Sequence, residues 1–162
     1  VQPFIDVCKR DDKGLFVLVR TSNPSAGDIQ NLKLEDGRTV YQAMAQNCDT
    51  WGKELIGDNG FSSLGAVVGA TWPEQAVEAR KLMPNNLILV PGYGAQGAGA
   101  DAAVASFTRE GTGSIVNASR SLMCAWKRRT DLETHEFQKA TREEALDMRA
   151  KLNAALADRK YI

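Results

Sequence analysis

Glycine and arginine residues between positions 91 and 120 have the types and spacing needed to bind a phosphate group. Pro91 interrupts an apolar segment and opens the glycine-rich stretch 92–97 (GYGAQG), and Arg120 follows the next apolar segment. Glycines leave backbone N–H groups open to an anion, and arginine adds a planar, permanently charged donor group. The pattern therefore predicts a phosphate-binding site built from these two segments.

The glycine-rich stretch also fits G-x-G-x-x-G, the pattern of dinucleotide-binding folds. That function requires an acidic residue roughly 20 positions further on, at the end of the next strand. The corresponding region contains Asn117, Ser119 and Arg120 instead of an acid. Dinucleotide binding is therefore disfavoured. The main alternative to phosphate binding is a loop whose glycines serve turn geometry alone.

Short apolar segments alternate with helix-like segments along the chain. We expect strands at 15–19, 64–70, 87–90 and 114–118 because these runs are short, apolar and rich in β-branched residues. We expect helices at 3–11, 39–56 and 73–82, and a last one from Thr141, where Thr141 and Glu144 fit a capping box. This alternation predicts an α/β fold with a parallel sheet, either doubly wound or a barrel.

Binding residues in parallel α/β folds gather where the strands end. The predicted strands are followed by residues 21–23, 69–71, 91–97 and 119–120, among which Ser22, Gln96 and Arg120 are the candidate site residues. In barrels the phosphate site often lies in the loops after the last two strands, which is where both phosphate-like segments occur here. A barrel needs eight strands in about 250 residues, whereas this chain of 162 residues offers four. The chain therefore looks like the second half of a barrel.

Four segments taken together resemble orotidine 5′-phosphate decarboxylases, most closely the longer bacterial enzymes. They are 19–26 (VRTSNPSA), 68–71 (VGAT), 90–97 (VPGYGAQG) and 116–120 (VNASR). Their order and spacing match the family, and the similarity covers nearly the whole chain. The resemblance implies a (βα)8 TIM barrel that converts orotidine 5′-monophosphate to uridine 5′-monophosphate in pyrimidine biosynthesis without a cofactor or metal.

The same resemblance assigns a role to each candidate site residue. Ser22 matches the serine that contacts the pyrimidine ring, and Pro91 begins the mobile loop that closes over the ligand. Gln96 on that loop would bridge base and phosphate. Arg120 matches the phosphate-binding arginine, and the backbone N–H groups of Ser119 and Arg120 would complete the phosphate site. Ser119 stands where this family often has glycine.

The catalytic signature of the family, Asp-x-Lys-x-x-Asp, does not occur in these residues. The segment 11–16 (DDKGLF) begins correctly but ends in phenylalanine, and it precedes a strand instead of following one. In the family, the catalytic residues lie on strands before the segment where this chain begins. We therefore expect residues 1–162 to be the carboxyl-terminal half of a single barrel domain, with strands five to eight, no catalytic residue and little activity alone.

Composition limits the partners that the chain is expected to have. Its 20 basic and 20 acidic side chains balance, so no nucleic-acid or membrane partner is indicated. The three separated cysteines and the single histidine suggest neither a disulfide framework nor a metal site. A cytoplasmic location is the simplest interpretation. The family resemblance adds two expected partners, the missing amino-terminal half and a second subunit in a homodimer.

Two alternatives to the decarboxylase remain open. The first is a non-catalytic phosphate-binding half-barrel that pairs with itself, because an open parallel sheet has two unpaired edges. The second is another phosphate-binding barrel, such as a sugar-phosphate decarboxylase. That enzyme would bind sugar phosphates in preference to uridine monophosphate.

Overall fold

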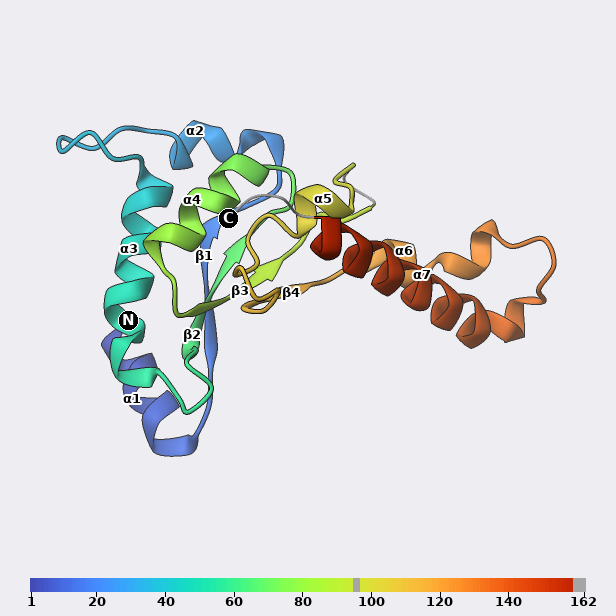
Figure 1. Cartoon of the computed structure of the whole chain (residues 1–162), viewed down its shortest axis with the longest axis horizontal. Coiled ribbons are helices and arrows are strands. Elements are labelled where there is room, and N and C mark those ends of the chain that lie inside the picture. The colour runs from blue at the N-terminus through green and yellow to red at the C-terminus, as the bar shows by residue number, and fades with distance from the viewer. Residues whose placement is uncertain (95–96, 159–162) are drawn as a thin grey trace.

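A four-stranded parallel sheet forms the centre of the computed structural model, which describes residues 1–94 and 97–158. The strands lie in the order β1-β2-β3-β4, so strands that follow each other in the sequence are also neighbours in the sheet. Helices connect them (Figure 1). The strands are β1 (Leu15–Arg20), β2 (Ser62–Val68), β3 (Asn86–Val90) and β4 (Ser114–Val116).

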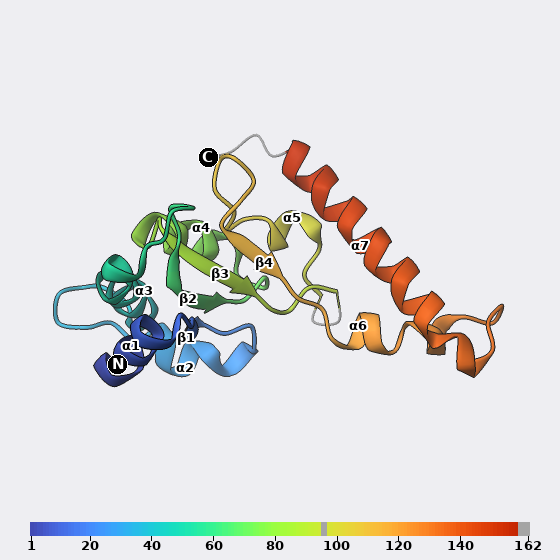
Figure 2. The same ribbon diagram turned by 90° about the horizontal axis from the view of Figure 1, so that it is seen from below.

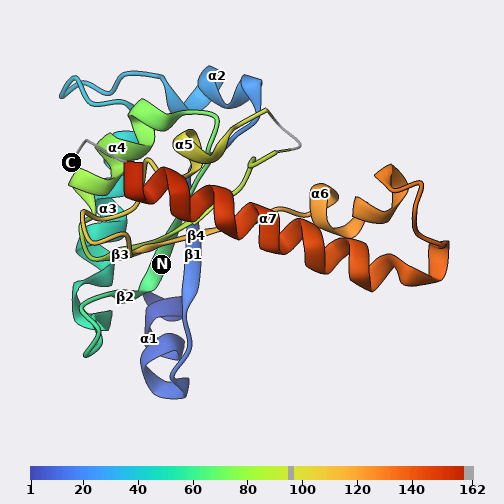
Figure 3. The ribbon, with the colours of Figure 1, turned by 45° about the vertical axis from the view of Figure 1, so that its right-hand side comes forward.

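Three helices lie beside β1, β2 and β3, and a fourth, much longer one lies beyond β4 (Figures 1 and 3). The first three are α1 (Gln2–Asp11), α3 (Val40–Gly52) and α4 (Pro73–Leu82), and the long one is α7 (Phe137–Asp158). Proline lies in the first turn of α1 and of α4, where its missing N–H breaks no helical hydrogen bond. Three α-helices are single turns: α2 (Gly27–Gln30), α5 (Ala100–Ala103) and α6 (Arg120–Met123). Short 3-10 turns lie at Pro24–Ala26 and Ala125–Arg128.

Alternate strand residues face the helices and form the hydrophobic core. Small side chains on the helices, such as Ala45, Ala76 and Ala79, let α3 and α4 approach the sheet closely. The buried strand residues that meet them are Val19, Leu64, Ala66, Val68, Ile88 and Val90. This face supplies most of the buried apolar area of the chain and therefore most of its hydrophobic stabilisation.

The opposite face of the sheet is also apolar but is open to solvent. Phe16 and Leu18 on β1 are 44% and 63% exposed, and Ile115 on β4 is 51% exposed. The ring of Phe16 lies over Gly65, where an added Cβ would come within 2.4 Å of a ring carbon. Only one face of this sheet is therefore covered within the described part of the chain.

A buried arginine ties together the amino-terminal ends of β3 and β4. The guanidinium of Arg80 donates to the carbonyl oxygens of Ser106 (2.8 Å), Asn86 (2.8 Å) and Gly113 (2.7 Å), and also to those of Met83 and Pro84. Burial lowers the pKa of Arg80 to about 10, so the side chain stays charged at neutral pH. This contact lies at the edge of the sheet opposite to the predicted site.

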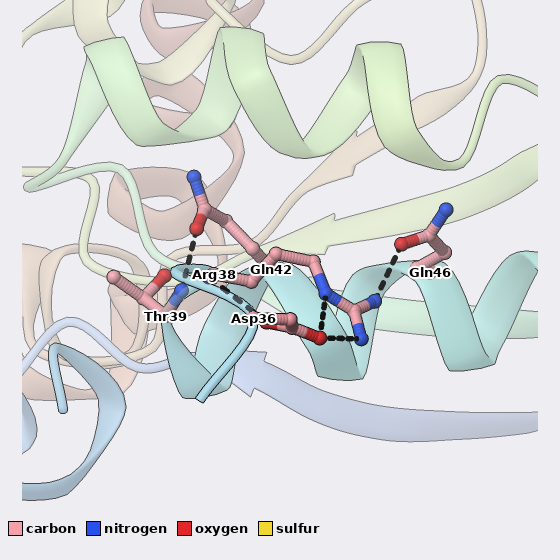
Figure 4. Close-up of polar contacts among 5 residues, drawn as sticks. All are labelled: Asp36, Arg38, Thr39, Gln42 and Gln46. Carbon is pink, nitrogen blue, oxygen red and sulfur yellow. Dashed lines mark hydrogen bonds and ion pairs between the residues drawn. The ribbon is translucent and has the colours of Figure 1, made fainter. Parts of the chain in front are cut away.

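Polar contacts around one turn fix the start of α3. Thr39 N donates to Gln42 Oε1 (2.6 Å), so this glutamine side chain satisfies a free donor at the helix start. Just before it, Arg38 Nε donates to Asp36 Oδ2 (2.9 Å), and Arg38 Nη1 donates to Gln46 Oε1 (2.6 Å). Figure 4 shows the Arg38 side chain lying along the helix between these two partners.

The expectation of a helix over 39–56 was too long by several residues. α3 ends at Gly52, and a 3-10 turn, Lys53–Leu55, follows. A Cβ at Gly52 would lie 2.7 Å from Ser62 Oγ, and this hydroxyl donates to Gly52 O (2.8 Å). Glycine at position 52 thus allows the start of β2 to pack directly against the end of the helix, and this contact is tertiary.

The expected start of the last helix at Thr141 was wrong. α7 begins at Phe137, after a 3-10 turn at Thr134–Glu136. Thr141 therefore lies one turn inside the helix, and its hydroxyl donates to Leu122 O (3.0 Å). The threonine ties α7 to α6 instead of capping a helix. α7 then runs back past β4 (Figure 2).

Burial makes a clear prediction for the cysteines. Cys48 is fully buried in α3, and burial raises the pKa of its thiol to about 12, whereas Cys124 is half-buried. Because the thiolate is the reactive form, we expect a thiol reagent at about pH 8 to modify Cys124 and to spare Cys48 in the folded protein. Mass spectrometry after timed exposure measures this. Equal labelling of the two in the folded state would contradict it, and equal labelling in denaturant is the control.

Candidate phosphate- and base-binding site

The carboxyl-terminal ends of the four strands lie along one edge of the sheet. Backbone hydrogen bonds continue past the strands and join the loops that leave them. They run from Gly69 N to Arg20 O (2.7 Å), from Ala70 N to Pro91 O (2.8 Å) and from Asn117 N to Val90 O (3.2 Å). The loops that carry the predicted site residues are therefore held in a continuous row.

Ser22 lies in the first of these loops, immediately after β1, and is half-buried. Its carbonyl oxygen accepts a hydrogen bond from Thr71 Oγ1 (3.0 Å) in the loop after β2. A Cβ at Gly69 would lie 2.7 Å from Ser22 Cβ and 2.8 Å from Ser22 Cα. Glycine at position 69 is thus what allows the two loops to lie so close together.

We expect Gly69→Ala to displace Ser22, because the new methyl group would overlap backbone atoms that cannot rotate away. Overpacking of this kind costs about 1–3 kcal/mol of folding stability. Thermal unfolding and the backbone amide shifts of residues 21–23 would measure both effects. The matched control is Gly99→Ala, since an added Cβ at Gly99 meets nothing within 4 Å. An unshifted Ser22 amide in the Gly69 variant would contradict the prediction.

The glycine-rich loop after β3 uses its glycines for turn geometry. Gly92, Gly94 and Gly97 have φ angles of 97°, 71° and 91°, a region that side-chain-bearing residues rarely occupy. Gly94 N donates to Ala98 O (3.0 Å), and Gly97 N donates to Gly94 O (2.9 Å). Turn geometry therefore explains these glycines. At least two of their N–H groups are engaged within the loop. Gln96 lies outside the described residues.

The loop after β4 ends in the single-turn helix α6, with Ser119 as its N-cap residue and Arg120 as its first residue. Both side chains are exposed. Within the described part of the chain, the Arg120 guanidinium takes part in neither an ion pair nor a side-chain hydrogen bond. The first N–H groups of a helix also have no acceptor within that helix. Cationic and N–H donors are therefore presented together at this strand end.

The glycine-rich loop and the start of α6 lie next to each other. A Cβ at Gly94 would lie 3.8 Å from Ser121 Oγ, which is ordinary contact distance. A cavity of about 340 Å³ opens beside this contact, with Tyr93, Gly94 and Ser121 on one wall. Residues of α7 form the other wall, where Lys151 pairs with Asp147 (2.6 Å). The two segments singled out in the sequence are thus brought side by side.

The structure places the described site residues in two groups along one edge of the sheet. The loop after β2 bonds to both Pro91 and Ser22, through Ala70 N and Thr71 Oγ1. Ser119 and Arg120 begin α6, which lies next to Gly94. Sequence reasoning missed Arg20, which is fully buried behind Ser22. The available signal was a charged residue that directly ends an apolar run (LFVLVR).

A family model described as orotidine 5′-phosphate decarboxylase / HUMPS family matches residues 1–134. The chain belongs to this family. It is 43% identical over 155 residues to the orotidine 5′-phosphate decarboxylase of Rhodopirellula baltica, a match that covers 94% of this chain and 51% of that protein. It is 41% identical to the Clostridium perfringens enzyme, with 96% of this chain and 53% of that protein covered. The chain thus spans about half the length of the curated relatives it matches.

Solved structures of the family share the fold. The UMP synthase of Leishmania donovani superposes with a TM-score of 0.72 at 31% identity, over 99% of this chain and 31% of that one. The OMP decarboxylase of the same organism gives a TM-score of 0.70 at 32% identity, over 96% of this chain and 52% of that one. The predicted fold class is confirmed: the parallel α/β sheet corresponds to about half of a TIM barrel.

The described helices include none long and apolar enough to cross a membrane.

Proposed function

We propose that this chain is the carboxyl-terminal half of an orotidine 5′-monophosphate decarboxylase of the longer bacterial branch, and that it supplies phosphate and base binding. The observation that carries the proposal is that Gly94 and Ser121 line the same cavity, and that Ser121 directly follows the exposed Arg120. This cavity lies between the loops after the last two strands, which is where barrels commonly bind phosphate. The family membership of the chain supports the same reaction.

In this proposal each site residue has the role that the family resemblance implies. Arg120 and the N–H groups of Ser119 and Arg120 hold the phosphate, and Ser22 contacts the pyrimidine ring. Pro91 begins the closing loop, and Gln96 joins base and phosphate. Binding energy from the phosphate, a group that does not react, stabilises the closed loop and the transition state.

The proposed reaction needs a proton donor and carboxylates that the site residues of this chain do not supply. The Asp-x-Lys-x-x-Asp signature is absent from the sequence, so an amino-terminal half of the barrel supplies it in the proposal. In that half, the lysine protonates the carbon that loses CO2. The proposal also includes a cytoplasmic homodimer that requires no cofactor.

A chimera tests the proposed function directly. It joins the amino-terminal half of the Rhodopirellula baltica enzyme to this chain, and the change in pyrimidine absorbance follows decarboxylation of orotidine 5′-monophosphate. We expect the chimera to turn over substrate and the chain alone to be silent, while NMR titration shows that the chain alone binds uridine 5′-monophosphate. A folded chimera without turnover, together with a chain that does not bind the nucleotide, would overturn the proposal.

The uncovered sheet face favours a second candidate, a non-catalytic half-barrel that pairs with itself. Phe16, Leu18 and Ile115 are exposed on that face, and β1 and β4 are both edge strands. Exposed apolar surface and open edges promote association. Sedimentation distinguishes the candidates: a concentration-dependent dimer without turnover in the chimera supports the second. A screen in which sugar phosphates bind better than uridine 5′-monophosphate would support a sugar-phosphate decarboxylase.

A further inference from the structure

A buried polar network lies directly behind the loop that carries Ser22. Its centre is Arg20, the last residue of β1, which is fully buried. Arg20 Nε donates to Gln75 Oε1, Arg20 Nη1 donates to Gln30 Oε1 (2.9 Å), and the guanidinium stacks over the Trp72 ring at 4.3 Å from its centroid. The network therefore joins β1 to α2 and to α4.

The same network binds the polar groups of Thr21, the residue before Ser22. Gln30 Oε1 accepts from Thr21 N (3.1 Å), and Gln30 Nε2 donates to Thr21 Oγ1 (3.3 Å). Trp72 Nε1 donates to Thr21 O (3.1 Å). The backbone N–H, the backbone carbonyl and the hydroxyl of Thr21 are thus all fixed from the side that faces the helices.

This arrangement carries an energetic cost. The guanidinium is held by neutral partners, and Arg20 Nη2 is buried without a hydrogen-bond partner among the described residues. A buried charge without a carboxylate is expensive, and apolar side chains of similar size often serve stability as well or better. Burial lowers the pKa of Arg20, in agreement with this cost.

We propose that Arg20, Gln30 and Trp72 form a positioning network that sets the Thr21–Ser22 peptide and so places Ser22 against the pyrimidine ring. The inference rests on the proposed function, because it gives Ser22 a base to contact. Arg20 acts through Gln30 and Trp72 and does not itself touch the ligand. The network thus contributes to recognition of the base and leaves phosphate binding to the loops after β3 and β4.

Paired ligands test this division in the chain itself. Uridine 5′-monophosphate carries base, ribose and phosphate, whereas ribose 5-phosphate carries the sugar and the phosphate without the base. We expect Gln30→Leu to weaken binding of the nucleotide about tenfold, the effect of one misplaced polar contact, and to leave binding of ribose 5-phosphate unchanged. Gln30→Glu keeps an acceptor for Arg20 and Thr21 and should bind both ligands like the wild type.

Two controls separate positioning from folding and from the proposed function. Arg80→Lys weakens the hydrogen bonds that the buried Arg80 makes at the far edge of the sheet. It should therefore lower stability without changing the preference for the nucleotide. Amide exchange at Thr21 should rise in Gln30→Leu and stay slow in Gln30→Glu. A folded Gln30→Leu variant that keeps the wild-type preference overturns the inference. A wild-type chain without any preference for the nucleotide overturns the proposed function instead.

Discussion

Replacing Arg120 by alanine in the chimera should lower kcat/KM for orotidine 5′-monophosphate by about 10³-fold, or several kcal/mol, because charged hydrogen bonds in a closed site are strong. The arginine is exposed at the start of α6, directly before Ser121, which lines a cavity together with Gly94. Steady-state kinetics, followed by the change in pyrimidine absorbance, would measure the loss. An unchanged kcat/KM would remove Arg120 from the site.

The loss should affect binding and leave folding unchanged. Arg120 makes no side-chain hydrogen bond or ion pair with the described residues, and substitutions at such surface positions usually change stability by less than about 0.5 kcal/mol. Thermal unfolding of the variant should therefore match the wild type. Arg109→Ala is the control: it removes another exposed arginine from the loop that precedes β4. That variant should keep its full kcat/KM.

Replacing Arg80 by methionine should lower the free energy of unfolding by about 3–5 kcal/mol, the usual cost of breaking a buried charged network. The side chain donates to five backbone carbonyls, which would lose their partner inside the protein. An unsatisfied buried polar group costs about 1–3 kcal/mol, so several together dominate the lost packing. Urea unfolding of the isolated chain would measure the change.

The control for Arg80 is an arginine whose only partner among the described residues is an exposed neighbour. Arg10 pairs with Asp11 at the surface (2.8 Å), and exposed pairs contribute little to stability. Arg10→Met should therefore leave the unfolding curve nearly unchanged. A small effect of Arg80→Met, equal to that of Arg10→Met, would show that water or rearranged backbone groups replace the five hydrogen bonds.

Local sequence patterns predicted the strands and most of the helices, because each of these elements leaves a short-range signal. The apolar runs at 15–19 and 87–90 became β1 and β3 almost unchanged. Tertiary contacts lie at both misplaced helix ends: Ser62 Oγ donates to Gly52 O, and Thr141 Oγ1 donates to Leu122 O. A side chain that finds its partner far along the chain leaves no local pattern to detect.

The sequence by itself determined the order of the strands, the α/β class and the two phosphate-like segments, since all three depend on residue type and spacing along the chain. Tertiary structure alone decided that Gly94 and Ser121 line one cavity and that Arg20 reaches Gln30, Gln75 and Trp72 behind Ser22. These contacts arise only when parallel strands place their carboxyl-terminal ends at one edge, which brings distant loops into one row. The site is therefore encoded in separate segments and assembled by the sheet.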